Sequence, residues 1–590
     1  MRLAIAQITP VSGDIAGNEQ RLSAVIEQAE ARGADLLVAP EMTITGYCIG
    51  DQIEELEFLA ANRAAAERLA ARARAMAVIF GFIEYNADER NEDGRIRKYN
   101  AAAVAQHGRI VGVARKSLLP SYRYFDDKRY FSPASGRAPI PISLGTREVR
   151  LGVSICEDMW DGAYAVKPIP ELVRQGAALL VNINASPFYP GKRFVRDAII
   201  RHHVTLSGLP FVYVNTVGIG DNGKNLIPFD GESLVYDSRG QIVAIGKPFE
   251  SDCLIADLDG PCAGLTLPPI AREQELYDGL VFSLREYARV TGFTQAVVPV
   301  SGGIDSALAL AITAAAFGPE QVSAYNLPSR FNTETTRTIA TRLAANFGVP
   351  YRTIPIEEID EVVTRTFERH THPIARDVTR QNIHARIRGL LMMAESNDTG
   401  RLLISCGNET EVALGYATLY GDMCGGLSLI GDLSKTDVYR VARYVNARHG
   451  REMIPLDAFT IAPSAELCAD QRDPFDYDVT APLVSLMIEH RHSPAAVIAA
   501  FRSRTLDPAL FPADASNRTV YDKHDATSFE QLVYDTYVRM KRAVYKRLQG
   551  PPIVVVSERA FGFDLRETII NGWTGRLDHG ADPSDPRARS

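Results

Sequence analysis

A glycine-containing loop near the middle of the sequence has the composition expected of a phosphate-binding site. It follows the apolar, β-branched run 296–298 and precedes the helix-forming stretch 307–312. Its residues are Pro299, Val300, Ser301, Gly302, Gly303, Ile304, Asp305 and Ser306. Glycines let the main chain approach a ligand closely, and the first turn of a helix presents unpaired N–H groups. The pattern predicts a phosphate cradle, and a plain Gly-Gly turn before a buried helix is the alternative.

A carboxylate in this loop indicates a bound cation. The commoner P-loop ends in a lysine and Ser/Thr, whereas this loop carries Asp305 at that point. Glu411 follows a second predicted strand, 402–405, and two carboxylates with phosphate oxygens form a typical Mg²⁺ site. The alternative for Glu411 is an acidic residue favoured by a helix dipole. Lys435 is a candidate phosphate contact or, read alone, a solvated lysine.

Three further reactive residues follow predicted strands in the first half: Glu41, Lys116 and Cys156. Taken singly, they read as a loop glutamate, a surface lysine and a core cysteine. Together they suit nucleophilic catalysis. Lys116 would lower the pKa of the Cys156 thiol, and Glu41 would accept its proton. The Lys116 ammonium and the backbone N–H of Glu157 would stabilise a developing oxyanion.

Strands and helices alternate early in the first half, and hairpins come later. This order predicts an α/β layered domain with a mixed sheet. Strands are expected at 3–8, 35–39, 78–85, 100–105, 109–114, 149–155, 178–184, 210–217 and 253–257, and helices at 18–31 and 51–76.

The second half alternates regularly between strands and helices, which predicts a doubly wound parallel sheet. The expected helices are 273–288, 333–346 and 381–395, and the strands are 296–298, 322–327, 351–355 and 402–405. Ligands bind at the carboxyl ends of the strands in such sheets. Both the glycine loop and the segment 406–411 lie at such ends.

Composition narrows the class of protein. The chain has 590 residues, 46% hydrophobic and 23% charged, which fits two or more globular domains. A net charge of −8 argues against a broad nucleic-acid surface, and no apolar run is long enough to cross a membrane. The amino-terminal stretch does not read as a signal peptide, and the seven cysteines lack paired spacing. We therefore expect a cytoplasmic protein without nucleic-acid or membrane partners.

Three segments of the first half, 38–42, 115–120 and 155–160, resemble the signatures of the nitrilase (carbon–nitrogen hydrolase) superfamily. The resemblance covers about residues 1–260 and implies an α-β-β-α sandwich with a Glu41, Lys116 and Cys156 triad. In the branch that uses glutamine, it implies substrate binding by Tyr122, Ser186 and Lys192. Asp127 stands where that branch usually has glutamate.

The glycine loop resembles the signature of the ATP pyrophosphatases, and the second half as a whole resembles the synthetase domain of NAD synthetases. The matching segments are 299–306, 381–388, 407–422, 433–435, 462–467 and 545–547. The resemblance implies Mg²⁺ at Asp305 and Glu411. It implies ATP contacts at 299–306, Cys406, Lys435 and Ser464, and deamido-NAD contacts at Asn382, Glu411 and Lys546. Cys406 and His384 replace a threonine and a glutamine that are usual in this family.

Two other motifs are interpreted as structural. Residues 218–223 fit G-x-G-x-x-G, but the following sequence predicts a hairpin where a dinucleotide site needs a helix. The H-x-H pairs at 370/372 and 490/492 lack further ligand-like spacing, so we expect solvated loop histidines.

The two resemblances together imply glutamine-dependent NAD synthesis, with ammonia passed through a sheltered route between two sites. We expect domains at 1–260 and 272–575, a linker at 261–271, a disordered tail at 576–590, and a homo-oligomer. Two alternatives stay open: a stand-alone amide hydrolase with a degenerate ATP domain, and a non-catalytic nucleotide sensor. Intact Asp305 and Glu411 argue against the first, and the complete triad argues against the second.

Overall fold

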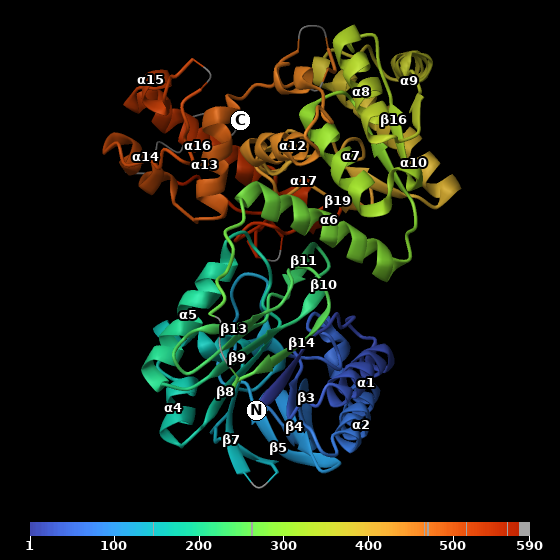
Figure 1. The fold of residues 1–590 in the computed structure, drawn as a ribbon. Coiled ribbons are helices and arrows are strands. Elements are labelled where there is room, and N and C mark those ends of the chain that lie inside the picture. Colours follow the sequence, from blue (N-terminus) through green and yellow to red (C-terminus); the bar gives the residue numbers. More distant parts are fainter. Residues whose placement is uncertain are drawn as a thin grey trace. The chain divides into compact units, whose positions relative to one another are not determined.

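A computed structural model describes residues 1–145, 147–260, 264–464, 466–468, 471–514, 516–562 and 564–576. The chain divides into two compact units, Met1–Gly292 and Phe293–Ser590 (Figure 1). Residues 261–263 of the expected linker and residues 577–590 of the expected tail lie outside the described part. The helix at 272–291, which the sequence grouped with the second half, belongs to the first unit.

Two six-stranded sheets build the first unit. One has the order β14-β1-β2-β3-β4-β5 and the other β13-β12-β9-β8-β7-β6. The strands of the first sheet are β1 (Arg2–Gln7), β2 (Leu36–Val38), β3 (Ala77–Arg90), β4 (Ile96–Gln106), β5 (Arg109–Arg115) and β14 (Asp252–Asp257). Those of the second are β6 (Ile140–Leu144), β7 (Arg147–Ile155), β8 (Leu179–Asn184), β9 (Phe211–Asn215), β12 (Leu234–Tyr236) and β13 (Ile242–Ile245).

The two sheets pack face to face, and helices cover their outer faces. Side chains alternate across a strand, so Leu3 and Ile5 join the core between the sheets, while Ala4 and Ala6 pack outward under helices. The helices of this unit are α1 (Ile15–Ala31), α2 (Leu56–Arg72), α3 (Asp127–Tyr130), α4 (Pro168–Arg174), α5 (Lys192–Ser207) and α6 (Arg272–Thr291). Figure 1 shows α1 and α2 on one side of the strands and α4 and α5 on the other. The predicted α-β-β-α sandwich is confirmed.

The G-x-G-x-x-G stretch forms a hairpin, as expected. Strand β10 (Val217–Asp221) pairs antiparallel with β11 (Asn225–Asp230), and no helix starts at its end. The turn at Asn222 and Gly223 is therefore a structural turn.

The second unit contains a parallel sheet with the order β20-β19-β18-β15-β16-β17. Its strands are β15 (Ala296–Pro299), β16 (Val322–Asn326), β17 (Tyr351–Thr353), β18 (Leu402–Ser405), β19 (Leu427–Ser428) and β20 (Ile553–Val554). On one face, Ile387 and Met392 of α10 (Asp377–Thr399) pack on Val297 and Leu403. The neighbouring Val298 points to the opposite face. Helix α7 (Ile304–Phe317) packs on β15 and β16, and its neighbours are α8 (Glu334–Phe347) and α12 (Lys435–His449). Helices on both faces confirm the doubly wound sheet.

Further helices extend this unit. They are α9 (Glu357–His370), α11 (Glu409–Leu414), α13 (Tyr477–Ile488), α14 (Pro494–Arg502), α15 (Val520–Lys523), α16 (Ala526–Arg542) and α17 (Val544–Arg547). Leu483, Val497, Phe501 and Phe529 lie in the separate core of the carboxy-terminal helices. Contrary to the loop expectation, His370 is the last residue of α9. None of the described helices is long and apolar enough to cross a membrane.

Two candidate active sites

In the first unit, the three predicted catalytic residues follow three different strands. Glu41 comes after β2, Lys116 directly after β5, and Cys156 directly after β7. All three are nearly inaccessible to solvent. Cys156 has a φ of 43°, a left-handed conformation that costs a non-glycine residue energy. Such backbone strain at a strand end is typical of a functional side chain that the fold holds in a fixed orientation.

Lys116 forms the centre of the first site by ion-pairing with two carboxylates. Its Nζ lies 2.7 Å from Glu41 Oε1 and 2.7 Å from Asp127 Oδ2. Burial opposes the charge on Lys116, but Asp127 and Glu41 outweigh burial and hold its pKa well above the usual value. Asp127 thus reaches the lysine although its side chain is one methylene shorter than the glutamate usual here.

Each carboxylate is fixed by a second set of donors. Asn100 Nδ2 donates to Glu41 Oε1 at 2.7 Å, and the backbone N–H of Ala185 donates to Glu41 Oε2 at 2.8 Å. The Tyr47 hydroxyl donates to Asp127 Oδ1 at 2.6 Å. These bonds join parts of the chain that are far apart in sequence. Asn100 and Tyr47 were not predicted from the sequence, because their residue types carry no local signal for this role.

The pKa of Cys156 differs from the expectation. Burial raises it well above the usual value, and Glu41 raises it further, while Lys116 acts in the opposite direction. Lys116 is already neutralised by two carboxylates, so a thiolate would add another negative charge to a buried group. The expected lowering by Lys116 is therefore present, but burial and Glu41 outweigh it, so the pKa of the thiol is raised overall.

Asp158 ties the cysteine turn to the lysine segment. Its Oδ1 accepts from the backbone N–H groups of Ser117 at 3.0 Å and Leu118 at 2.8 Å. Its Oδ2 accepts from the N–H of Ile155 at 3.1 Å, just before Cys156. Burial raises the pKa of Asp158 to about 6, although these N–H donors favour its charged form. The sequence analysis included Asp158 in a motif but gave it no role.

The predicted glutamine-binding residues lie on segments next to the triad. The Tyr122 hydroxyl donates to Glu157 Oε1 at 2.8 Å, beside Cys156, and Tyr164 donates to the same oxygen at 2.8 Å. Ser186 follows Ala185, the residue that binds Glu41, and the Ser186 N–H donates to Asn215 Oδ1 at 2.8 Å. Tyr122 is exposed, whereas Ser186 is buried.

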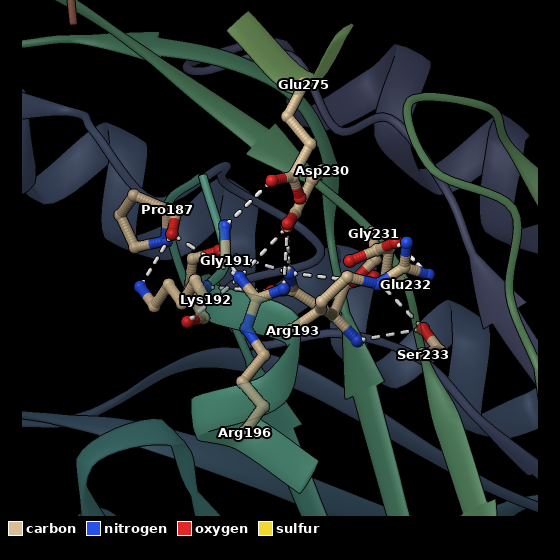
Figure 2. A network of polar contacts seen from close by, with 12 residues as sticks. Pro187, Gly191, Lys192, Arg193, Arg196, Asp230, Gly231, Glu232, Ser233 and Glu275 are labelled. Carbon is tan, nitrogen blue, oxygen red and sulfur yellow. Dashed lines mark hydrogen bonds and ion pairs between the residues drawn. The ribbon is translucent and has the colours of Figure 1, made fainter. Parts of the chain in front are cut away.

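Lys192 begins α5 inside a buried network of charged side chains. Its Nζ donates to the Pro187 carbonyl at 2.6 Å, and nearby Arg196 binds Asp230 through two hydrogen bonds of 2.8 and 2.9 Å (Figure 2). Burial, with a further contribution from Arg196, holds the pKa of Lys192 well below its usual value. Among the described residues, no carboxylate pairs with Lys192. In the same part of the chain, the buried Lys192 Nζ contacts the Pro187 carbonyl and the Tyr189 ring, whose centroid is 5.1 Å away, and such a group without a carboxylate partner is suited to an anionic ligand.

In the second unit, the glycine loop lies between β15 and α7, as predicted. Gly302 has a φ of 94°, and a Cβ there would collide with the carbonyl oxygen of Thr336, so the position requires glycine. The Ser306 hydroxyl donates to the Gly303 carbonyl at 3.0 Å, and the Gly303 N–H donates to Ser301 Oγ at 3.2 Å. These bonds shape a tight turn whose remaining N–H groups lie at the start of a helix.

Lys435 connects the two predicted metal ligands. Its Nζ lies 2.5 Å from Asp305 Oδ2 and 3.6 Å from Glu411 Oε1. Asn408 donates to Asp305 Oδ1 at 2.8 Å and caps the helix that carries Glu411. Burial, together with the Asp305 charge, raises the pKa of Glu411 to about 8. Two crowded carboxylates that share one cation suit a cation site.

Two other predicted ATP contacts lie close to this loop. Cys406 Sγ lies 3.7 Å from the Pro299 carbonyl oxygen, and burial raises its pKa. Ser464 Oγ accepts from the Glu466 N–H at 3.0 Å. The Glu466 carboxylate in turn accepts from the Thr336 hydroxyl at 3.0 Å, behind Gly302.

Asn382 and Lys546 both form hydrogen bonds with the segment that follows α11. Asn382 Oδ1 accepts from the Thr418 hydroxyl at 2.9 Å. Lys546 Nζ donates to the carbonyls of Gly415 and Ala417 at 2.8 Å each, and burial lowers its pKa. The structure gives neither of them a bond to the glycine loop. His384, which replaces the usual glutamine, is buried with Nε2 3.1 Å from Asp360 Oδ2.

Comparison with protein families matches both units. Residues 2–264 match the carbon-nitrogen hydrolase model, and residues 276–505 match the NAD synthase model. Curated glutamine-dependent NAD(+) synthetases from Thermotoga maritima and Synechocystis sp. are each 33% identical to this chain. These alignments cover 97% of this chain and 98% and 99% of those proteins.

Among solved structures, a glutamine-dependent NAD+ synthetase from Acinetobacter baumannii in complex with ADP is 30% identical, with a TM-score of 0.71. The match covers 98% of this chain and 99% of that one. Such matches do not favour the alternative of a stand-alone amide hydrolase. The two sites and the full-length relatives lead to one conclusion: this chain belongs to the glutamine-dependent NAD(+) synthetases.

Proposed function

We propose that this chain hydrolyses glutamine at the Cys156 site and uses the ammonia to convert ATP-activated deamido-NAD to NAD at the glycine loop. The observation that carries the proposal is the presence in one chain of two complete charge centres. One is Lys116 with Glu41 and Asp127, and the other is Lys435 with Asp305 and Glu411. A chain that used only one of these activities would have no need of both.

At the first site, Glu41 accepts the thiol proton as Cys156 Sγ attacks the side-chain amide carbon of glutamine. The Lys116 ammonium and the backbone N–H of Glu157 stabilise the oxyanion. Collapse of the tetrahedral species breaks the C–N bond, and Glu41 returns the proton to the departing ammonia. Water then hydrolyses the glutamyl thioester. The raised pKa of Cys156 favours loss of the proton together with the attack.

Glutamine is held by its amino-acid end. The Lys192 ammonium, which lacks a carboxylate partner among the described residues, pairs with the α-carboxylate of the substrate. Ser186 and Tyr122 complete the binding site. This arrangement leaves the amide end directed toward Cys156.

At the second site, residues 299–306 bind the phosphates of ATP, with Lys435, Ser464 and Cys406 as further contacts. The nicotinate carboxylate of deamido-NAD, bound by Asn382, Glu411 and Lys546, attacks the α-phosphorus and expels pyrophosphate. Ammonia then attacks the acyl-adenylate and displaces AMP, giving NAD. The solved relative with bound ADP supports nucleotide binding in this family.

Asp305 and Glu411 would hold Mg²⁺, whose charge would neutralise that of the phosphates. The residues present fit this ion, because Mg²⁺ is commonly held by one or two carboxylates plus substrate phosphates. The contacts of Lys435 with both carboxylates support this assignment, because they bring a positive charge to the same place.

The proposal is tested with purified protein given deamido-NAD, ATP and Mg²⁺, and either glutamine or ammonium. Cys156→Ala should abolish glutamine-supported NAD synthesis and leave ammonium-supported synthesis intact. Asp305→Ala should abolish both. Loss of both activities in a folded Cys156→Ala protein would contradict the division of labour.

We also propose a homo-oligomer in the cytoplasm. Helix α9 exposes the apolar side chains of Val362, Val363 and Phe367, which a second copy would cover. The six described cysteines are all free thiols, which suits a reducing compartment. Sedimentation of Val363→Glu should show smaller particles than the wild type; an unchanged size would exclude this face as the interface.

A further inference from the structure

Helix α6 packs against the segment that carries the proposed glutamine contacts. The NAD synthase family match begins at residue 276, within this helix, yet α6 belongs to the first unit. Three α6 residues on one helical face, Glu275, Gly279 and Phe282, lie along this packing surface. The helix therefore contributes to a site that the sequence assigned to another domain.

The first contact fixes the start of α5. Glu275 Oε2 accepts a hydrogen bond of 3.0 Å from the backbone N–H of Gly191, and Figure 2 shows Glu275 directed at this point. Gly191 has a φ of 79° and directly precedes Lys192, the first residue of α5. A carboxylate here is also favoured by the helix dipole. Glu275 thus restrains the residue next to the lysine that would bind the substrate.

The second contact places an aromatic ring against a helix position that lacks a side chain. A Cβ added to Gly279 would lie 2.8 Å from Phe188 Cε1. The Phe188 ring lies 5.1 Å from that of Phe249, which lies 5.0 Å from Phe282 of α6. Phe188 follows Ser186 by two positions. Any larger residue at 279 must therefore displace the Phe188 ring, whose backbone is two positions from Ser186.

The opposite side of α5 is anchored by buried ion pairs. Arg196 holds Asp230 at the end of β11, and Arg193 Nη2 lies 2.8 Å from Glu232 Oε1. With α6 on one side and these pairs on the other, the start of α5 is held on two sides. Lys192 itself takes no part in these ion pairs, so its ammonium keeps its place while it remains available to a ligand.

We infer that α6 is part of the glutamine site, with Glu275 and Gly279 as positioning residues for Lys192 and Ser186. This inference rests on the proposed role of Lys192 in binding glutamine. Beyond that role, the inference is that α6, which contains no predicted site residue, helps to determine the affinity for glutamine. Disturbing α6 at these two positions should weaken glutamine binding without changing the chemistry at Cys156 or at the glycine loop.

The test measures steady-state NAD synthesis by the full-length Glu275→Ala and Gly279→Ala proteins. We expect KM for glutamine to rise about tenfold in Glu275→Ala and about fivefold in Gly279→Ala, with kcat within about twofold of wild type. Ammonium-supported synthesis should be unchanged. Alanine favours a helix over glycine, so an effect of Gly279→Ala would not arise from weakening α6.

Glu286→Gln is the matched control, because it removes a carboxylate of the same helix whose ion-pair partner within the described part of the chain is the surface residue Arg289. Its KM for glutamine should equal that of wild type. Lys192→Ala separates the two proposals. If its KM is unchanged, the role of Lys192 is wrong. If it rises while both α6 variants behave like wild type, the role of α6 is overturned and the proposed function stands. An equal fall of glutamine- and ammonium-supported synthesis in the α6 variants also overturns it.

Discussion

Each unit builds its site around a lysine held by two carboxylates and a tyrosine ring. Lys116 Nζ lies 2.7 Å from Glu41 and 2.7 Å from Asp127, with the Tyr47 ring centroid at 5.7 Å. Lys435 Nζ lies 2.5 Å from Asp305 and 3.6 Å from Glu411, with the Tyr477 ring centroid at 5.1 Å. The same set of groups thus occurs on two unrelated folds.

The two lysine–carboxylate centres differ in two respects. The two lysine–carboxylate distances are equal in the first and unequal in the second, and the carboxylates are buried in the first and partly exposed to solvent in the second. The side chains of Lys116 and Glu41 are 0% exposed and Asp127 is 5% exposed, so no ion can replace the lysine without opening the site. In the second unit, Asp305 and Glu411 are 18% and 20% exposed, and one contact is long. The first lysine is therefore a permanent part of its buried ion-pair cluster. The second lysine occupies the place between two carboxylates where, in the proposed function, a metal ion would bind.

The largest expected effect separates the two lysines by nitrogen source. Lys116→Met should reduce glutamine-supported NAD synthesis by about 10³-fold or more, because the oxyanion loses its cation, and should leave ammonium-supported synthesis unchanged. Lys435→Met should reduce both activities by about 10²-fold or more. Initial rates with each nitrogen source check this. If Lys435→Met lowered only the glutamine-supported rate, the assignment of the two lysines to two different reactions would be wrong.

A second prediction concerns stability and Mg²⁺. Lys116→Met leaves two buried carboxylates without a cation and should cost about 3–5 kcal/mol of folding free energy. Mg²⁺ cannot reach that site and should not restore the loss. In Lys435→Met, added Mg²⁺ should recover part of the lost stability by binding the two partly exposed carboxylates. Thermal unfolding of each variant with and without Mg²⁺ measures this effect. If Mg²⁺ changed the stability of both variants equally, the proposed difference in metal access between the two sites would be wrong.

A third prediction concerns the thiol. Glu41 raises the pKa of Cys156, so Glu41→Gln should lower it and increase the thiolate fraction at a given pH. Alkylation of Cys156 by iodoacetamide at pH 8 should then be several times faster than in wild type, although glutamine turnover is lost. Wild-type alkylation should rise with pH only above the usual thiol range. Mass spectrometry of the Cys156 peptide gives the rates, and slower alkylation in the variant would contradict this electrostatic account.

The smallest effect is expected at Cys406. Its Sγ lies 3.7 Å from the Pro299 carbonyl oxygen, and a thiol is a weak hydrogen-bond donor. Cys406→Thr restores the hydroxyl usual in the family and should lower KM for ATP by about twofold to threefold. The KM for glutamine serves as the internal control. A rise in KM for ATP would show that the thiol suits this site better than a hydroxyl.

The local sequence pattern was sufficient to predict where strands end and which reactive residue types follow them. Glu41, Lys116 and Cys156 were predicted from an apolar run followed by a reactive side chain, and each lies just past a strand, while Asp305 lies in the first turn of the helix that follows the glycine loop. The carboxyl ends of neighbouring strands lie close together in a sheet, which explains this success. Helix α9 was missed, although Ile359, Val362, Val363 and Phe367 recur at helical spacing; in the structure none of its residues is fully buried.

Contacts between distant segments could not be read from the sequence. Asn100 lies 59 positions from Glu41, and Ala185 lies 144 positions from it, yet both donate to its carboxylate. The reach of Asp127 depends on the backbone of α3, whose first N–H binds the Pro120 carbonyl at 3.1 Å. The net charge around Cys156 likewise depends on how many carboxylates converge on Lys116.

The sequence by itself determined the two folds, the reactive residue types and the family, because strand periodicity and motif spacing are local properties of the chain. Only the tertiary structure decided that both lysines are shared between two carboxylates, that burial and Glu41 raise the pKa of the Cys156 thiol, and that α6 packs on the segment of the proposed glutamine contacts. The reason is physical: pKa values and side-chain positions depend on every charge and surface nearby, whatever their separation along the chain.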